Sequence, residues 1–217
     1  YNQRSSSATV GDGHGIAFTG TNGRNVNITN CRLYGNDGQG LQVSSISAHS
    51  LILTNSSIFS NKYGGINIGT IASSLISACS IMGNGIKQVS DGGGSSNISI
   101  GFSDTLNDTQ RGNIVQGCTI SARLLARGDA SFSALEGIET CDCNINIQEG
   151  GAGTKILNNT IVYGGYGHYS WDSIRLDANQ CTIKGNTFIN PFRCIKFGSA
   201  TEGNIFKENR ITSAVSN

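Results

Sequence analysis

The stretch Asn27-Ile-Thr-Asn-Cys31-Arg-Leu-Tyr-Gly-Asn36 contains the pattern that decides the fold. Within it, a small polar residue is followed two positions later by an aliphatic one, as in Cys31-Arg32-Leu33. The same triplet recurs as Ser56-Ser57-Ile58, Cys79-Ser80-Ile81, Cys118-Thr119-Ile120, Asn159-Thr160-Ile161, Asn186-Thr187-Phe188 and Asn209-Arg210-Ile211. The first residues of the triplets are 25, 23, 39, 41, 27 and 23 positions apart, so the basic period is near 25 and two intervals contain insertions.

A second segment follows each of the first six triplets: a turn rich in Gly and Asn, then a short strand with period-two alternation. The segments are Gly40–Val43, Gly65–Ile68, Gly137–Thr140, Ser173–Leu176 and Cys194–Phe197, with Gly15–Phe18 before the first triplet and Gly85–Gln88 matching at its start. A period in the low twenties with several short strands is typical of one turn of a parallel β-helix. The sequence therefore predicts an all-β fold, a right-handed single-stranded parallel β-helix of seven to eight coils.

Stacked coils place equivalent residues in rows. The polar residues that open the triplets are expected to occupy one inward corner and to hydrogen-bond along the rod axis. The residues expected to stack inward as one row are Leu33, Ile58, Ile81, Ile120, Ile161, Phe188 and Ile211. The thiols of Cys31, Cys79 and Cys118 should be buried and unreactive. Leucine-rich repeats and propellers are excluded because their marker residues are missing.

Composition and charge exclude several classes of protein. With 30 Gly, 13% charged residues and many β-branched residues, the 217-residue chain is not helical. A net charge of +1 gives no electrostatic signature for nucleic acid, and no apolar run predicts membrane insertion. Seven cysteines cannot all pair within the chain, and Cys141-Asp-Cys143 lacks a second ligand pair, so two buried thiols are expected there. We expect no metal and no cofactor.

The chain is expected to form one domain over 1–217, with an irregular lead-in over 1–11 and a longer parent protein around it. Insertions are predicted at about 90–111, 123–134 and 163–172. Solenoids carry function on insertions and on one face, because their core positions are committed to stacking. The last two insertions should stand beside a column of outward mid-strand positions: Ala17, Gln42, Asn67, Lys87, Glu139, Arg175 and Lys196. An alternative is that one unaligned coil lies between Lys87 and Glu139. A polar column beside two loops predicts a groove for an extended, chain-like ligand.

The third insertion supplies the best candidates for contact with a sugar. Trp171, Tyr166 and Tyr169 could stack on the apolar faces of sugar rings, or could instead fold together as a small core of the loop. His168 is a weaker substrate-binding candidate from the same segment. The cations of the column, Lys87, Arg175 and Lys196, could bind uronate or sialate carboxylates or serve as the base of a lyase, or could merely keep the strand face soluble.

Four carboxylates are candidates for catalysis. Glu139, Asp172 and Asp177 could supply the acid and the base or nucleophile of glycoside hydrolysis, and Glu136 has the same standing. The alternative is an exposed ion pair between Glu139 and Arg175, which would contribute little to stability.

The coils, such as Asn27–Asn36 and Lys184-Gly-Asn186-Thr-Phe-Ile-Asn190, resemble the β-helix domains of pectate-lyase-like proteins and especially of bacteriophage tailspikes. The likeness covers about Asp12 to Thr212. The calcium-binding Asp cluster of pectate lyases and the Asp pairs of polygalacturonases are not matched, so no catalytic residue is carried over. The resemblance implies a homotrimeric spike, extracellular or on the virion tail, that recognises a bacterial surface polysaccharide.

Three functions remain open from the sequence. The first is a polysaccharide-degrading glycoside hydrolase, which paired carboxylates in the groove would favour. The second is a glycan-binding or structural β-helix without chemistry, which their absence would favour. The third is a polysaccharide lyase or epimerase, which needs a basic residue with Tyr or His over the groove.

Overall fold

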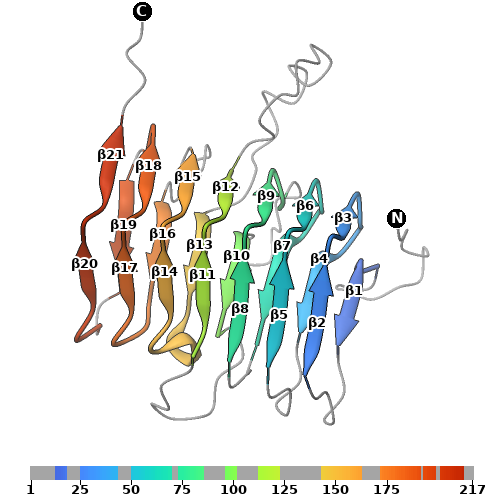
Figure 1. Cartoon of the computed structure of the whole chain (residues 1–217), viewed down its shortest axis with the longest axis horizontal. Helices are drawn as coiled ribbons and strands as arrows, with labels where there is room; N and C mark the ends of the chain where they lie inside the picture. The colour runs from blue at the N-terminus through green and yellow to red at the C-terminus, as the bar shows by residue number, and fades with distance from the viewer. Residues whose placement is uncertain are drawn as a thin grey trace, which may run out of the picture.

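The chain winds into a rod of stacked coils (Figure 1), and a computed structural model describes residues 13–18, 25–43, 50–69, 73–85, 96–101, 112–122, 143–162, 172–191, 193–198 and 201–212. Its strands form three sheets of seven strands each, in which every coil contributes one strand to each sheet. All neighbouring strands pair in parallel, for example β4 with β7 and β7 with β10. The predicted parallel β-helix is confirmed, with seven coils.

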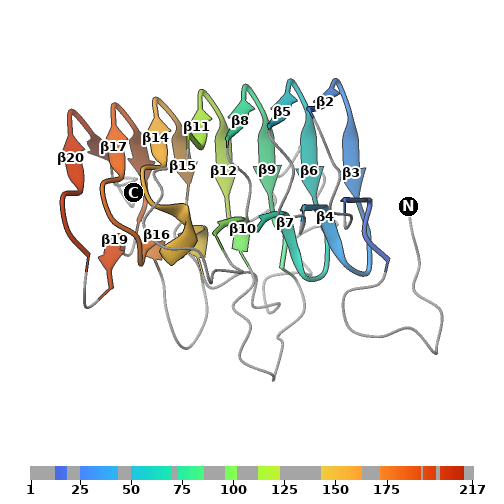
Figure 2. The same ribbon diagram turned by 90° about the horizontal axis from the view of Figure 1, so that it is seen from below.

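We call the three sheets A, B and C. Sheet A contains β1 (Ile16–Phe18), β4 (Gln39–Val43), β7 (Gly64–Ile68), β10 (Ser96–Ile100), β13 (Cys143–Ile147), β16 (Asp172–Leu176) and β19 (Arg193–Phe197). Sheet B contains β2 (Val26–Thr29), β5 (Leu51–Thr54), β8 (Ser74–Ser77), β11 (Ile114–Gln116), β14 (Lys155–Leu157), β17 (Thr182–Lys184) and β20 (Ile205–Lys207). Sheet C contains β3 (Arg32–Tyr34), β6 (Ser57–Phe59), β9 (Ser80–Met82), β12 (Thr119–Ser121), β15 (Thr160–Val162), β18 (Thr187–Ile189) and β21 (Arg210–Thr212). A short 3-10 helix, Glu149–Gly151, follows β13. Figure 2 shows sheet B along one edge of the rod and sheet A along the other.

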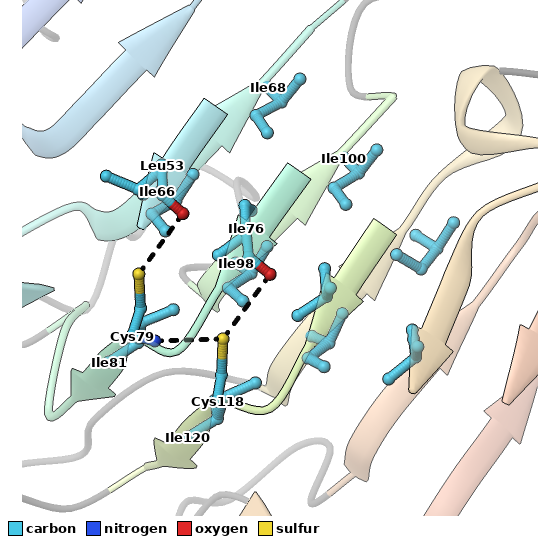
Figure 3. Packing of buried hydrophobic residues seen from close by; sticks show 14 of the residues in the cluster. Leu53, Ile66, Ile68, Ile76, Cys79, Ile81, Ile98, Ile100, Cys118 and Ile120 are labelled. Atoms are coloured by element: carbon cyan, nitrogen blue, oxygen red, sulfur yellow. Dashed lines mark hydrogen bonds between the residues drawn. The ribbon is translucent and has the colours of Figure 1, made fainter. Parts of the chain in front are cut away.

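The core is built from rows of aliphatic side chains, mostly isoleucine. The predicted row on sheet C is confirmed, because Leu33, Ile58, Ile81, Ile120, Ile161, Phe188 and Ile211 pair in register from coil to coil. Ile58 through Phe188 in this row are fully buried, whereas Ile211, in the last described coil, is 61% exposed. Figure 3 shows how these rows meet those of sheets A and B. Branching at Cβ suits this stacking, because such side chains pack well on a pleated surface.

Each corner between sheets B and C combines a left-handed backbone residue with a small polar residue. Positive φ angles occur at Asn30, Asn55, Ala78, Gly117, Asn158, Gly185 and Glu208, one in each coil. The next residue is the polar residue that opens the triplet, and its side chain accepts a bond from the preceding coil. Cys31 N–H donates to Ser56 Oγ at 3.1 Å, and Asn159 N–H donates to Asn186 Oδ1 at 2.9 Å. The expected polar ladder at this corner is confirmed.

The thiols in this ladder lie inside the rod, as Figure 3 shows for Cys79 and Cys118. Both are buried as expected, whereas Cys31 is only half-buried, and all six cysteines among the described residues are free. A hydrogen bond with Cys79, together with burial, raises the pKa of the Cys118 thiol. Burial raises the pKa of Cys181 to about 11. Cys143 is buried as predicted, and Cys141 lies outside the described residues.

A second ladder, made only of asparagine amides, runs beside the first strand residues of sheet A. The Nδ2 groups of Asn36, Asn61, Asn84 and Asn97 each donate to the Oδ1 of the next member, at 2.7, 2.8, 2.8 and 2.8 Å, and Asn144 is the last member. The first three come from the corner before the strand, but Asn97 and Asn144 belong to the strands β10 and β13 themselves. Where a corner supplies the amide, the strand in the preceding coil has glycine as its second residue. Gly40 lies beside Asn61, and Gly65 lies beside Asn84. These glycines leave room for the amide, because a Cβ on Gly65 would lie 2.8 Å from Asn84 Nδ2.

Two predicted strands of sheet A differ from those in the structure. The strands of the fourth and fifth coils are β10 and β13, in place of the predicted Gly85–Gln88 and Gly137–Thr140. The segment 90–111, expected as one insertion, therefore contains β10. The physical reason is the amide ladder: β10 and β13 carry Asn97 and Asn144 where β4 and β7 carry the glycine on which the sequence alignment relied.

Ala78 stands at a corner position that glycine or asparagine occupies in five of the other six coils, with a φ of 52°. Left-handed backbone costs an L-residue about 1–2 kcal/mol, and glycine lacks this penalty but loses about 0.4–1 kcal/mol more chain entropy. We therefore expect Ala78→Gly to raise the free energy of unfolding by about 0.5–1 kcal/mol in urea denaturation. Ala17→Gly, on an ordinary strand position in β1, should lower it by a similar amount. A loss of stability in both variants would contradict the corner assignment.

Candidate functional site

The outer face of sheet A carries one column of polar side chains, which we call the outer column. Its members, paired in register, are Gln42, Asn67, Ser99, Asn146, Arg175 and Lys196. The column exists because each member from Gln42 to Arg175 lies between two buried aliphatic residues of its strand, and alternate residues face opposite sides of a sheet. In β10, for example, Ser99 lies between Ile98 and Ile100, which are both fully buried.

The predicted column was correct at Ala17, Gln42, Asn67, Arg175 and Lys196 and wrong at two positions. Ser99 occupies the place assigned to Lys87, and Asn146 occupies the place assigned to Glu139. Both errors follow from the displaced strands. Lys87 and Glu139 themselves lie outside the described residues, so their proposed roles stay predictions without the geometric support of the column.

Sheet A also holds a group of buried oxygens without hydrogen-bond partners. Among the residues that the structure describes, five buried side-chain atoms lack a partner: Asn67 Oδ1, Ser96 Oγ, Asn146 Oδ1, Asp172 Oδ2 and Ser173 Oγ. All five belong to four consecutive strands of this sheet, β7, β10, β13 and β16. Native proteins pair nearly all of their buried polar atoms, so five unpaired atoms in four neighbouring strands mark this part of sheet A as unusual.

Two arginines of sheet A are held in place by aspartates. Arg175 Nε donates to Asp177 Oδ2 at 3.0 Å, and Arg193 Nε donates to Asp172 Oδ1. The arginine side chains are 44% and 45% exposed, whereas Asp172 is fully buried. The hydrogen bond that Arg193 donates to Asp172 raises the pKa of Arg193, so this guanidinium stays charged. Within the described part of the chain, no acceptor bonds to the terminal nitrogens of either arginine.

The structure does not bring Asp172 and Asp177 together as a catalytic pair. Asp172 opens β16 and Asp177 follows its last residue. Five residues of extended chain separate them by roughly 16 Å, whereas glycosidase carboxylates are about 5–9.5 Å apart. Each carboxylate instead binds an arginine, and the ion-pair partner of Arg175 is Asp177, two residues further along the chain.

The remaining predicted site residues lie outside the described residues: Glu136, Tyr166, His168, Tyr169 and Trp171. The described residues on either side show that 123–142 and 163–171 both connect sheet C to sheet A, in neighbouring coils. The segment 86–95 makes the same connection one coil earlier.

Sequence reasoning missed three residues of sheet A: Ser99, Asn146 and Arg193. Ser99 and Asn146 were hidden because their strands lack the glycine signature. Arg193 was recognisable only as the residue before Cys194, and its contact with Asp172 comes from the register of β16 with β19.

Across the described ranges, no three His, Cys, Asp or Glu side chains gather as a metal site. The same ranges contain no helix that is both long and apolar enough to cross a membrane.

Comparison with known proteins identifies the family. Residues 14–211 match the family described as right handed beta helix region, so the chain belongs to this family. No curated protein and no solved structure matches the chain. The family fixes the class of protein, a right-handed β-helix, and leaves the ligand to be argued from the face of sheet A.

Proposed function

We propose that the protein recognises an extended polysaccharide along the outer column of sheet A. The observation that carries this proposal is the unbroken column of polar side chains on one face of the rod, which includes the amides of Asn67 and Asn146. Their strands are two coils apart, which is about 9.6 Å at the usual strand spacing of about 4.8 Å. Sugar hydroxyls are hydrogen-bond donors that repeat along a polymer, and this spacing is close to the length of a disaccharide.

The sequence resemblance to tailspikes supports a bacterial surface polysaccharide as the ligand. We accordingly propose that the protein acts as part of a homotrimeric spike, extracellular or on a virion tail. Binding is the function that the described residues support best.

Cleavage of the bound glycan is a further proposal. It depends on Glu136 or Glu139, because Asp172 and Asp177 lie at opposite ends of β16 and each binds an arginine. Detection of new reducing ends would support hydrolysis. Unsaturated sugar products, detected by their ultraviolet absorbance, would support a lyase.

The binding proposal predicts the effect of Asn146→Ala. A panel of capsular and O-antigen polysaccharides identifies the polymer that the parent protein binds. The variant loses one neutral hydrogen bond, worth about 0.5–1.5 kcal/mol, so its affinity should fall by about threefold to tenfold. Stability should be unchanged or slightly higher, because the lost oxygen is buried and unpaired.

The matched control is Asn27→Ala, since Asn27 is exposed on β2 of sheet B. It should bind like the parent protein. Equal affinity of the parent and Asn146→Ala for the identified polymer would remove the outer column as the binding face.

A further inference from the structure

We propose that the polysaccharide is acidic and that its carboxylate groups bind between Arg175 and Lys196. This inference rests on the proposed function and adds the substrate class and the residues that select it. It is argued from the change in side-chain charge along the outer column. Gln42, Asn67, Ser99 and Asn146 are uncharged, and the next two members, Arg175 and Lys196, are cations.

The two cations are direct register partners on β16 and β19. Their strands are about 4.8 Å apart, and like charges placed directly opposite each other on a sheet destabilise it. Asp177 neutralises only one of them, and Lys196 has no carboxylate partner among the described residues. Two positive charges therefore face one negative charge, and a single further carboxylate makes the group neutral.

The Arg175 guanidinium is oriented to receive such a carboxylate. Asp177 accepts from Nε, which fixes one edge of the guanidinium plane, and this contact leaves the terminal nitrogens to the ligand. Arginine donors match a carboxylate in a planar, two-bond geometry, and Lys196 adds a point charge from the next coil. The arginine side chain is 44% exposed, so an external ligand can reach it.

The acidic polymer would lie along the rod axis with its hydroxyl groups on the amide end of the column. Its carboxylate would then meet the cations one coil beyond Asn146. A neutral polymer can make the hydroxyl contacts but leaves the cation pair uncompensated, so the charged repeat is selected.

The test compares each of three acidic polymers, polysialate, hyaluronate and polygalacturonate, with its own carboxyl-reduced form, which keeps the backbone and removes the charge. At least one acidic polymer should bind about tenfold more tightly than its reduced form, as charge-assisted hydrogen bonds predict. The preference should shrink as salt rises from about 0.05 M to about 0.5 M. Dextran sulfate tests whether sulfate replaces carboxylate.

Lys196→Gln should lower the affinity for the acidic polymer by about fivefold to tenfold and leave the reduced form unaffected. Lys207→Gln is the matched control, because Lys207 is an exposed lysine on β20 of sheet B. If acidic and reduced polymers bind equally and respond alike to Asn146→Ala, the carboxylate inference is overturned and the proposed function stands. If no polymer binds, both are overturned. Dextran sulfate binding as tightly as the best acidic polymer would overturn the assignment to carboxylate.

Discussion

Alanine in place of Asn61 is expected to lower the free energy of unfolding by about 3–5 kcal/mol. The Asn61 side chain makes four hydrogen bonds inside the rod. Its Oδ1 accepts from the Asn36 N–H at 3.2 Å and from Asn36 Nδ2 at 2.7 Å. Its Nδ2 donates to Leu33 O at 3.1 Å and to Asn84 Oδ1 at 2.8 Å. Alanine removes the oxygen that accepts from both Asn36 donors, and a buried donor that loses an acceptor costs about 1–3 kcal/mol.

Urea denaturation followed by circular dichroism measures this loss. Asn27→Ala removes the same amide from an exposed strand position and should change stability by less than about 0.5 kcal/mol. A loss below about 1 kcal/mol for Asn61→Ala would show that the amide ladder contributes little to the rod.

The second large effect is expected from Gly65→Ala, which should cost about 3 kcal/mol. A Cβ at this position would lie 2.5 Å from the Asn97 carbonyl oxygen and 2.8 Å from Asn84 Nδ2. The carbonyl belongs to the backbone of β10, so the two strands must move apart and the ladder must open. The measurement is again the free energy of unfolding in urea.

Gly117→Ala separates this steric effect from backbone strain. Gly117 has a φ of 59° and open space around its missing Cβ, so alanine there should cost only about 0.5–1 kcal/mol, which is the backbone strain less the chain entropy that alanine saves. If Gly65→Ala proves as mild as Gly117→Ala, close packing is not the reason for glycine in β7.

The core of the fold could be predicted because the inward row on sheet C has a constant offset from the corner residue. Cys31 and Leu33 have the same relation as Asn186 and Phe188, and insertions elsewhere in a coil do not alter it. Sheet A was harder to predict. Gly85-Ile86-Lys87 begins with the same Gly-Ile pair as Gly65-Ile66-Asn67, yet the fourth strand of this sheet is β10. Glycine at that position is a consequence of a corner asparagine, and β10 supplies the asparagine itself as Asn97.

The candidate site was predictable where alternation alone determines it. Arg175 faces outward because it lies between the core residues Ile174 and Leu176, and Lys196 follows it through the register of β16 with β19. The pairing of Arg193 with Asp172 was not predictable in this way, because it joins residues 21 positions apart through the register of two coils. The burial of Asp172 likewise comes from its tertiary surroundings, and burial favours an ion-pairing role over one as half of a solvent-accessible acid–base pair.

The amide ladder also makes this rod suitable for carrying foreign sequences. Asn36 and Asn61 are 25 residues apart and their amides bond at 2.7 Å, while Asn97 and Asn144 are 47 residues apart and bond at 2.8 Å. Nearly doubling the closed loop costs only about 0.6 kcal/mol of chain entropy, less than one buried hydrogen bond contributes. The connection between β12 and β13 therefore accepts some twenty residues without disturbing the coils that it joins. Peptides grafted at this corner of successive coils would be displayed at a fixed spacing of about 4.8 Å along the rod axis.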